Sequence, residues 1–99
     1  MMVLVTYDVG TQTDEGKRRL RQVARLCQNH GQRMQYSVFE CDLSPSEKIE
    51  LEEALRKIIN HDQDQVLFVS LGPAEGRGDR VITSLGLPYM KVDMPCYVV

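Results

Sequence analysis

Two short segments that are apolar at every position limit the fold of this 99-residue chain more than any other feature. They are Met-Val-Leu-Val at residues 2–5 and Val-Leu-Phe-Val at residues 66–69. Successive side chains of a strand point to opposite faces, so a sheet covered on one side alternates apolar and polar residues. These two strands therefore predict a sheet that is covered on both faces.

The first strand continues to Asp8, and an amphipathic helix is expected to follow it. Thr13 is a favourable N-cap, and the two acidic residues after it suit the positive end of the helix dipole. Gly31 is expected to end the helix near residue 30. At about 100° per residue, an apolar face lies opposite a basic face. The apolar face consists of Leu20, Val23, Ala24 and Cys27, and the basic face of Arg18, Arg21 and Arg25.

Residues 33–41 alternate as a strand should, and we expect one continuous strand there. This alternation would put Arg33 and Phe39 on the same face of the strand. Residues 42–43 are expected to form a bend or a short third strand. The segment therefore returns the chain to the sheet after the first helix.

A capping box, Ser-Pro-Ser-Glu at residues 44–47, predicts a second helix that runs to about residue 60. Residues 65–71 form the next strand, which a Gly-Pro pair ends. Residues 79–85 are expected to form one or two helical turns, and residues 96–99 a short terminal strand.

The order of these elements indicates an α+β protein with a single domain over residues 1–99. It fits a ferredoxin-like βαββαβ sandwich with a C-terminal extra strand, in which both helices lie on one face of the sheet. The other face then needs a cover. A second copy of the chain is the simplest cover, because two-fold pairing is the commonest symmetry, and we therefore expect a homodimer.

The C-terminal segment, residues 72–99, is expected to be the variable part of this domain. Its last strand could add to the edge of the partner's sheet, since an extended segment can pair with an open strand edge. The alternative is that residues 80–95 fold back over the open face of the sheet. A second copy would then not be needed to cover that face.

Charge is unevenly distributed along the chain, although the net charge is only −2. Residues 16–39 contain six basic residues and no acidic one, whereas residues 40–64 contain eight acidic residues and three basic ones. A local basic region on an acidic chain can bind the phosphates of a nucleic acid. The alternative is that the region is only the solvated face of a helix.

Four protein classes receive no support from the sequence. The three cysteines are an odd number and form no C-x-x-C motif, which argues against a disulfide framework and against a zinc site. No apolar run approaches the roughly 18 residues of a membrane span. The first residues also lack the features of a signal peptide, so we expect a cytoplasmic protein without membrane contact.

Asp8 is the candidate catalytic or metal-binding residue, because a charged side chain at the end of a buried strand is unusual unless it has a function or a partner. It shares a face with Leu4 and Thr6, and a two-fold axis at that face can bring two Asp8 side chains together. Two close carboxylates raise each other's pKa or recruit a cation. Mg²⁺ suits such a site, and a metal-bound water can attack a phosphodiester. The alternative is that Asp8 caps the following loop or pairs with an arginine.

Three segments together resemble the Cas-two family of CRISPR-associated proteins. They are Val-Leu-Val-Thr-Tyr-Asp-Val at 3–9, Lys-Arg-Arg-Leu-Arg-Gln-Val-Ala-Arg-Leu at 17–26 and Gly-Gln-Arg-Met-Gln-Tyr-Ser-Val-Phe-Glu-Cys at 31–41. The resemblance covers residues 2–71 well, and residues 72–95 match least. It implies a ferredoxin-like homodimer that acts in CRISPR adaptation, where the family joins the Cas-one integrase to bind and insert new spacer DNA. Several family members are Mg²⁺-dependent endonucleases on RNA or double-stranded DNA.

The resemblance also implies roles for individual residues. Asp8 would hold Mg²⁺ and, with Tyr7 beside it, would form the catalytic site. The nucleic-acid-binding residues would be Arg18, Arg19, Arg21, Arg33 and Phe39.

Three functional hypotheses follow from these residues. In the first, the chain is an enzyme in which Asp8 from each protomer holds Mg²⁺ and the arginines neutralise phosphate. In the second, the dimer is an architectural adaptor that grips duplex DNA between integrase subunits without catalysis. The third is a ferredoxin-like regulator of small molecules, which would need a pocket rather than a basic stripe. We favour the adaptor as the main role, with nuclease activity as an added capability.

Overall fold

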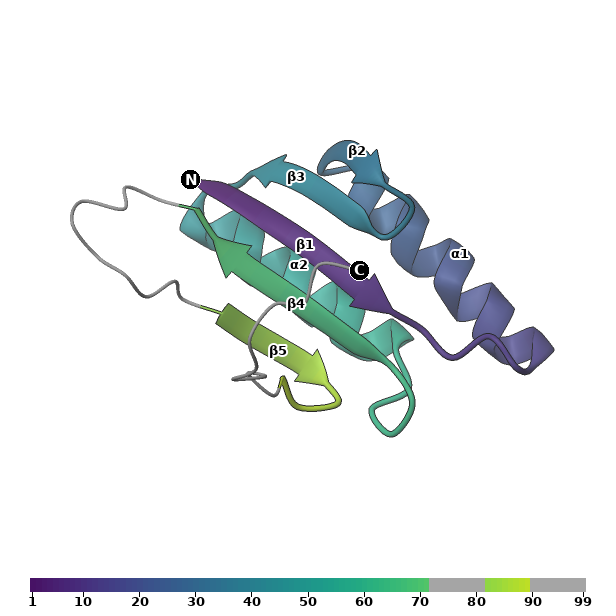
Figure 1. Ribbon diagram of the computed structural model, residues 1–99. Helices are drawn as coiled ribbons and strands as arrows, with labels where there is room; N and C mark the ends of the chain where they lie inside the picture. Colours follow the sequence, from purple (N-terminus) through teal and green to yellow (C-terminus); the bar gives the residue numbers. More distant parts are fainter. Residues whose placement is uncertain (72–81, 90–99) are drawn as a thin grey trace, which may run out of the picture.

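The computed structural model describes residues 1–71 and 82–89 of the chain. Within them, five strands form one antiparallel sheet with the order β2-β3-β1-β4-β5, and two helices lie on one of its faces (Figure 1). The elements are β1 (Met2–Asp8), α1 (Asp14–Gln28), β2 (Gly31–Gln35), β3 (Val38–Asp42), α2 (Pro45–Ile58), β4 (Gln65–Ser70) and β5 (Ile82–Gly86). The predicted α+β, ferredoxin-like class with both helices on one face is confirmed.

The hydrophobic core lies between the sheet and the two helices. From β1, Val3, Val5 and Tyr7 are buried in it, and the large rings of Phe39 and Phe68 fill its centre. The alternate residues of β1 are less buried and end in exposed Asp8. The strand therefore presents one face to the helices and the other to the side of the sheet that α1 and α2 do not cover, as the period of two requires.

Both helices begin as their sequences predict. The Thr13 hydroxyl accepts a hydrogen bond from the Gly16 amide at 3.0 Å, which caps α1. In α2, the Ser44 amide donates to the Glu47 carboxylate at 2.9 Å and the Glu47 amide donates to the Ser44 hydroxyl at 3.1 Å. This reciprocal pair is a complete capping box and explains why the helix starts at Pro45.

The single strand predicted for residues 33–41 is wrong, because the structure divides it into β2 and β3. Tyr36 and Ser37 form a turn between them. The two strands pair with each other, with Arg33 opposite Phe39 and an irregularity between Arg33 and Gln35. Arg33 and Phe39 therefore do meet, but as partners across a hairpin rather than as neighbours along one strand.

The helical turns expected at residues 79–85 are also incorrect where the structure describes them. Residues 82–86 form β5, which pairs with β4 from Gln65 opposite Gly86 to Val69 opposite Ile82. Gly86 has a φ of +80° and lies against the Asp64 backbone, a conformation that favours glycine. The terminal strand expected at 96–99 lies outside the described residues.

The face of the sheet away from the helices carries half-buried apolar side chains. Leu4 lies opposite Val69 on it, and Thr6 lies opposite Leu67. This is the face on which we expected a second copy of the chain. Neither helix that the structure describes is long and apolar enough to cross a membrane.

Candidate functional site

A cleft of about 450 Å³ opens at the end of β1. It brings together four residues that the sequence singled out, and they come from three separate elements. Tyr7 and Asp8 come from β1, Arg21 from α1 and Arg33 from β2. The cleft therefore combines a carboxylate with two guanidinium groups, which is a suitable arrangement for a phosphate ester and its hydrolysis.

The Arg33 side chain rests on an aromatic support. Its guanidinium carbon lies 5.2 Å from the centroid of the Phe39 ring, and that ring stacks on Tyr7 with centroids 6.1 Å apart. Phe39 is fully buried, so its ring offers no surface to a nucleic acid within this chain. It acts instead through Arg33, because a cation over an aromatic face is held in a preferred position.

Tyr7 fixes the turn that forms one wall of the cleft. Its hydroxyl donates a hydrogen bond to the Tyr36 carbonyl oxygen at 3.0 Å, and its amide donates to the Ser37 carbonyl oxygen at 3.1 Å. Burial and the neighbouring Cys27 raise the pKa of Tyr7, and Arg33 offsets only part of that rise. The phenol is therefore neutral at physiological pH and serves as a hydrogen-bond donor.

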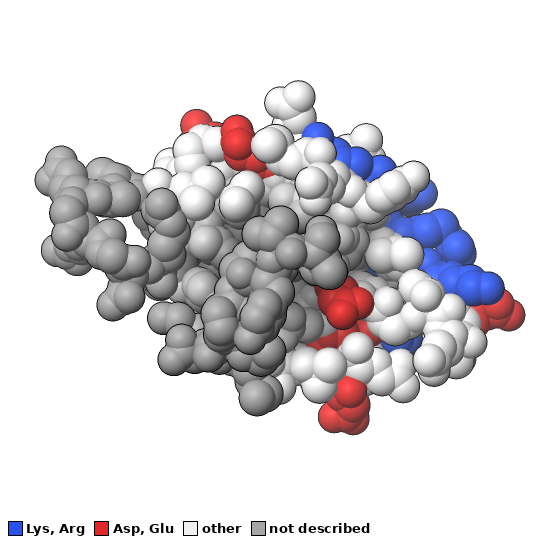
Figure 2. Space-filling model, in the orientation of Figure 1, with Lys and Arg blue, Asp and Glu red and all other residues white. Residues whose placement is uncertain are grey.

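The basic face of α1 extends the positive charge beyond the cleft. Lysine and arginine side chains gather along the side of the molecule where α1 lies, as Figure 2 shows. Arg18, Arg21 and Arg25 are exposed there, as predicted. In the part of the chain that the structure describes, the arginines in ion pairs are Arg19 and Arg56 alone. The exposed arginines of α1 and Arg33 are thus available to external anions.

Asp8 is exposed at the mouth of the cleft. The acidic partners of the ion pairs among residues 1–71 and 82–89 are Asp42, Glu52, Glu53 and Asp64, so Asp8 is not one of them. In the same residues, no three His, Cys, Asp or Glu side chains gather at a potential metal site. Among the described residues that line the cleft, Asp8 therefore supplies the one carboxylate.

Comparison with known proteins identifies the family. The sequence profile described as "CRISPR associated protein Cas2" matches residues 1–76. The chain belongs to the Cas2 family. It is 49% identical over 72 residues to the "CRISPR-associated endoribonuclease Cas2" of Chlorobaculum tepidum, covering 73% of this chain and 75% of that protein. It is 44% identical over 72 residues to the "CRISPR-associated endonuclease Cas2" of Halalkalibacterium halodurans, and the match covers 73% of this chain and 75% of that protein.

A solved Cas2 structure supports the same assignment. The crystal structure of Streptococcus pyogenes Cas2 at pH 6.5 has a TM-score of 0.69 and 48% sequence identity to this chain. The match covers 80% of this chain and 96% of that one. The resemblance that the sequence suggested is therefore confirmed at the level of family and fold.

Arg19, which we expected at the nucleic-acid surface of this Cas2 chain, is engaged in an internal ion pair. Its Nε donates to Asp64 Oδ2 at 2.8 Å and its Nη2 to Asp64 Oδ1 at 3.4 Å. Only 14% of the Arg19 side chain is exposed, and the Asp64 side chain is fully buried. Arg19 therefore has little charge to offer a phosphate, in contrast to Arg18 and Arg21.

Asp64 is the residue that the sequence analysis of this Cas2 chain missed. Besides Arg19, its carboxylate accepts hydrogen bonds from the Gly10 amide at 3.0 Å and the Asn60 amide at 2.8 Å. Burial raises the pKa of Asp64, but the hydrogen bonds from Arg19, Asn60 and Gly10 outweigh it and hold the pKa below its ordinary value. The charged carboxylate thus ties the loop after Asp8 to α1 and to the start of β4.

Helical spacing could have shown that Arg19 faces inward. Arg19 lies four residues before Val23 and eight before Cys27, both of which are buried on the inner face of α1. A cation on that face predicts a buried anionic partner, because an unpaired buried charge is costly. The loop also needs a glycine in α1, since a Cβ at Gly16 would lie 1.9 Å from the Gly10 carbonyl oxygen. Together these contacts fix the position at which Asp8 leaves the sheet.

Proposed function

We propose that this Cas2-family chain acts in CRISPR adaptation as a nucleic-acid-binding homodimer that works with the Cas-one integrase and can hydrolyse phosphodiesters with Mg²⁺. The observation that carries the proposal is the cleft at the end of β1, where the exposed Asp8 carboxylate lies with Arg21 and Arg33. The names of the relatives, endoribonuclease and endonuclease, support the nuclease part. As a CRISPR protein it would act in the cytoplasm, in antiviral defence.

The dimer is proposed from the face of the sheet that the helices leave uncovered. Leu4, Leu67 and Val69 are half-buried apolar side chains on that face, and Asp8 follows Leu4 and Thr6 along it. Two copies that pack with these faces together would bury apolar surface. A two-fold axis near the end of β1 would bring two Asp8 carboxylates together, one from each protomer.

Two Asp8 carboxylates, one from each protomer, are a suitable donor set for Mg²⁺. Mg²⁺ is usually bound by one or two carboxylates and keeps several of its waters, so two Asp8 side chains suffice and the three-ligand cluster of a closed site is not required. When bound, the ion would activate a water and stabilise the negative charge that develops on phosphate oxygens. Asp8 is the residue that would hold it.

The other cleft residues would bind and orient the nucleic acid. Arg21 and Arg33 would neutralise the phosphate next to the bond that breaks. Phe39 and Tyr7 would keep Arg33 in place through the aromatic stack, so that they act as positioning residues. Arg18 would contact phosphates farther along the backbone, because it is exposed on the same helix.

The second candidate is an adaptor that binds duplex DNA without hydrolysis. It is favoured by the length of the basic face of α1, where Arg18, Arg21 and Arg25 are all exposed. This surface is longer than one reacting phosphate requires, whereas an adaptor that follows a backbone would use all of it. We propose the adaptor as the main biological role and hydrolysis as an added capability.

The substitution Asp8→Asn tests the proposal. It removes the charge that would hold Mg²⁺ and leaves the arginines in place, so we expect cleavage to fall at least about 100-fold with nucleic-acid affinity unchanged. Cleavage of labelled RNA and duplex DNA would be measured with Mg²⁺ and with chelator, and affinity by fluorescence anisotropy. Asp62→Asn is the matched control, because Asp62 is an exposed acid on a different loop.

The outcomes separate the candidate functions. Full cleavage in chelator, or by the Asp8→Asn variant, would contradict the enzymatic proposal. Spacer acquisition in cells that is unchanged by Asp8→Asn would support the adaptor. Absence of nucleic-acid binding at low salt would contradict both and would favour the small-molecule regulator. A stable monomer at micromolar concentration would contradict the shared Asp8 site.

A further inference from the structure

Tyr36 is the most exposed large hydrophobic side chain among the residues that the structure describes. It is 92% exposed at the turn between β2 and β3, and its neighbour Met34 is 57% exposed. A single exposed aromatic residue is not unusual by itself. Three further observations distinguish Tyr36: its turn is fixed, a cation lies beside it, and it borders the Asp8 cleft.

The turn is held from beneath by Tyr7. The Tyr7 hydroxyl bonds to the Tyr36 carbonyl oxygen and the Tyr7 amide to the Ser37 carbonyl oxygen, at 3.0 and 3.1 Å. Because Tyr7 is itself buried in the core, the backbone that carries the Tyr36 ring is anchored to the rigid part of the molecule. Binding of a ligand then has to order the Tyr36 side chain but not the turn that carries it, which limits the entropic cost.

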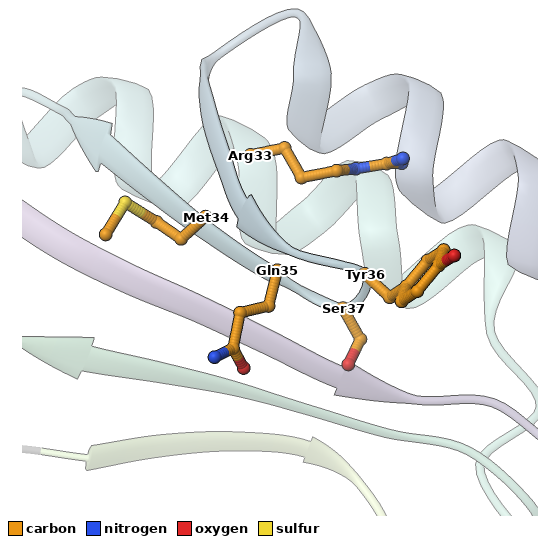
Figure 3. A pocket seen from close by; sticks show the side chains of 5 residues that line it. All are labelled: Arg33, Met34, Gln35, Tyr36 and Ser37. Atoms are coloured by element: carbon orange, nitrogen blue, oxygen red, sulfur yellow. The ribbon is translucent and has the colours of Figure 1, made fainter.

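Arg33 and Tyr36 extend in the same direction from the hairpin, whereas Met34 points the other way (Figure 3). These three residues, with Gln35 and Ser37, line a shallow cavity of about 600 Å³. Arg33, Tyr36 and Ser37 also line the cleft that contains Asp8. An exposed aromatic face, a guanidinium group and the candidate catalytic carboxylate therefore border one continuous surface.

We infer that Tyr36 is a base-stacking residue, on which a nucleobase packs while Arg33 contacts the adjacent phosphate. Aromatic rings next to cations are the usual platform for the bases of single strands, since every base offers a π-face. This inference rests on the proposed nucleic-acid-binding function and adds a substrate preference to it. A base inside a duplex has both faces covered by its neighbours, so the ring selects a nucleotide that is unpaired at the cleft.

The inference is tested by binding measurements on a single-stranded oligonucleotide and on a blunt duplex of the same sequence. Tyr36→Ala and Tyr36→Leu should weaken single-strand binding roughly five- to 150-fold, the range expected for loss of one stacked base, and should change duplex binding less than twofold. Tyr36→Phe keeps the ring and should bind both as the wild type does. Ile49→Ala is the control, because Ile49 is also an exposed apolar side chain but lies on α2 and lines neither the cavity nor the cleft.

A fluorescent base analogue gives a direct signal. The fluorescence of a strand that contains 2-aminopurine should be quenched on binding to the wild type and to Tyr36→Phe, and not on binding to Tyr36→Leu.

Unchanged single-strand affinity of Tyr36→Ala, or an equal loss of affinity for strand and duplex, would overturn the inference while the proposed function stood. A change in oligomeric state caused by Tyr36→Ala would also overturn it, because the ring would then be a protein contact. A wild type that binds neither oligonucleotide would overturn the proposed function as well.

Discussion

Asp8 and Asp64 lie at the same end of the sheet in opposite environments. Asp8 pairs across the strands with Gln65, the residue directly after Asp64. Asp64 is fully buried, and its oxygens accept hydrogen bonds from two backbone amides and from Arg19. Asp8 is exposed and belongs to none of the described ion pairs. One carboxylate stabilises the fold, and the other is available to an external cation or ligand.

The arginines of α1 divide in the same way. Arg19 is directed inward and paired with Asp64, whereas Arg18 and Arg21 are exposed on the basic face. Charged residues next to each other in the sequence thus have different tasks, because a helix turns each of them to a different environment. A substitution should therefore affect either the stability of the fold or the binding of nucleic acid, and only rarely both.

Asp64→Ala should have the largest effect on stability. It removes the partner of a mostly buried arginine and the acceptor of two backbone amides, so we expect a loss of about 3–5 kcal/mol in the free energy of unfolding. Asp8→Ala, by contrast, should change that free energy by less than about 0.5 kcal/mol, because Asp8 is exposed. Urea denaturation at one fixed protein concentration measures both values.

A loss this large could prevent Asp64→Ala from folding, so Asp64→Asn is the second variant. It keeps the shape of the side chain and one acceptor oxygen, and it should lose less stability than the alanine variant. Similar stability losses in the Asp8 and Asp64 variants would contradict the conclusion that Asp64 stabilises the fold and Asp8 does not.

The local elements of the fold could be predicted because each has its own signal. The Ser44 capping box marks the start of α2, and the spacing of Val23 and Cys27 marks the inner face of α1. The turn at residues 36–37 could not be predicted, since it contains no glycine, proline or asparagine and the alternation continues through it. It is fixed instead by the hydroxyl and amide of Tyr7, which is distant in sequence. Tertiary contacts here override the local pattern.

The candidate site was predictable to a similar degree. Asp8 and Arg33 could be chosen from the resemblance to a known family, and the structure brings them to one cleft. The burial of Phe39 and the pairing of Arg19 with Asp64 depend on how distant segments pack. The sequence contains a basic residue at Arg19 but does not specify its partner, which lies 45 positions away. The partner becomes evident only in the structure, where α1 lies beside the start of β4.

Arg18→Ala and Arg19→Ala form a matched pair: the first should affect nucleic-acid binding and the second the stability of the fold. Arg19→Ala leaves the buried Asp64 without its cation, so the free energy of unfolding should fall by about 1–3 kcal/mol. Arg18→Ala should leave stability unchanged and reduce the salt dependence of nucleic-acid binding by roughly 0.7–0.9 in the log–log slope, the value for one phosphate contact. Anisotropy titrations at several salt concentrations measure this slope. An unchanged slope for Arg18→Ala would mean that the basic face of α1 does not contact the backbone.

The free energy of unfolding at acidic pH should show how much the charge of Asp64 stabilises the fold. Because the pKa of Asp64 is lower in the folded chain than its ordinary value of 3.8, its contribution to stability is complete above that value. The contribution disappears as the pH falls through the folded pKa, with a slope of at most about 1.4 kcal/mol per pH unit for one proton. The stability gap between the wild type and Asp64→Asn should therefore be widest near neutral pH and should narrow as the solution becomes acidic.

Comparison of variants isolates this effect from other acids. Glu47 also has a lowered pKa, because the Ser44 amide donates to its carboxylate. Glu47 is present in the wild type and in Asp64→Asn alike. Its contribution therefore cancels when Asp64→Asn is compared with the wild type. Urea denaturation of the wild type and of Asp64→Asn, from pH 7 down to about pH 3, would record the gap. A constant gap would mean that the Asp64 carboxylate stays charged over the whole range or does not stabilise the fold through its charge, and the contrast with Asp8 would then rest on burial alone.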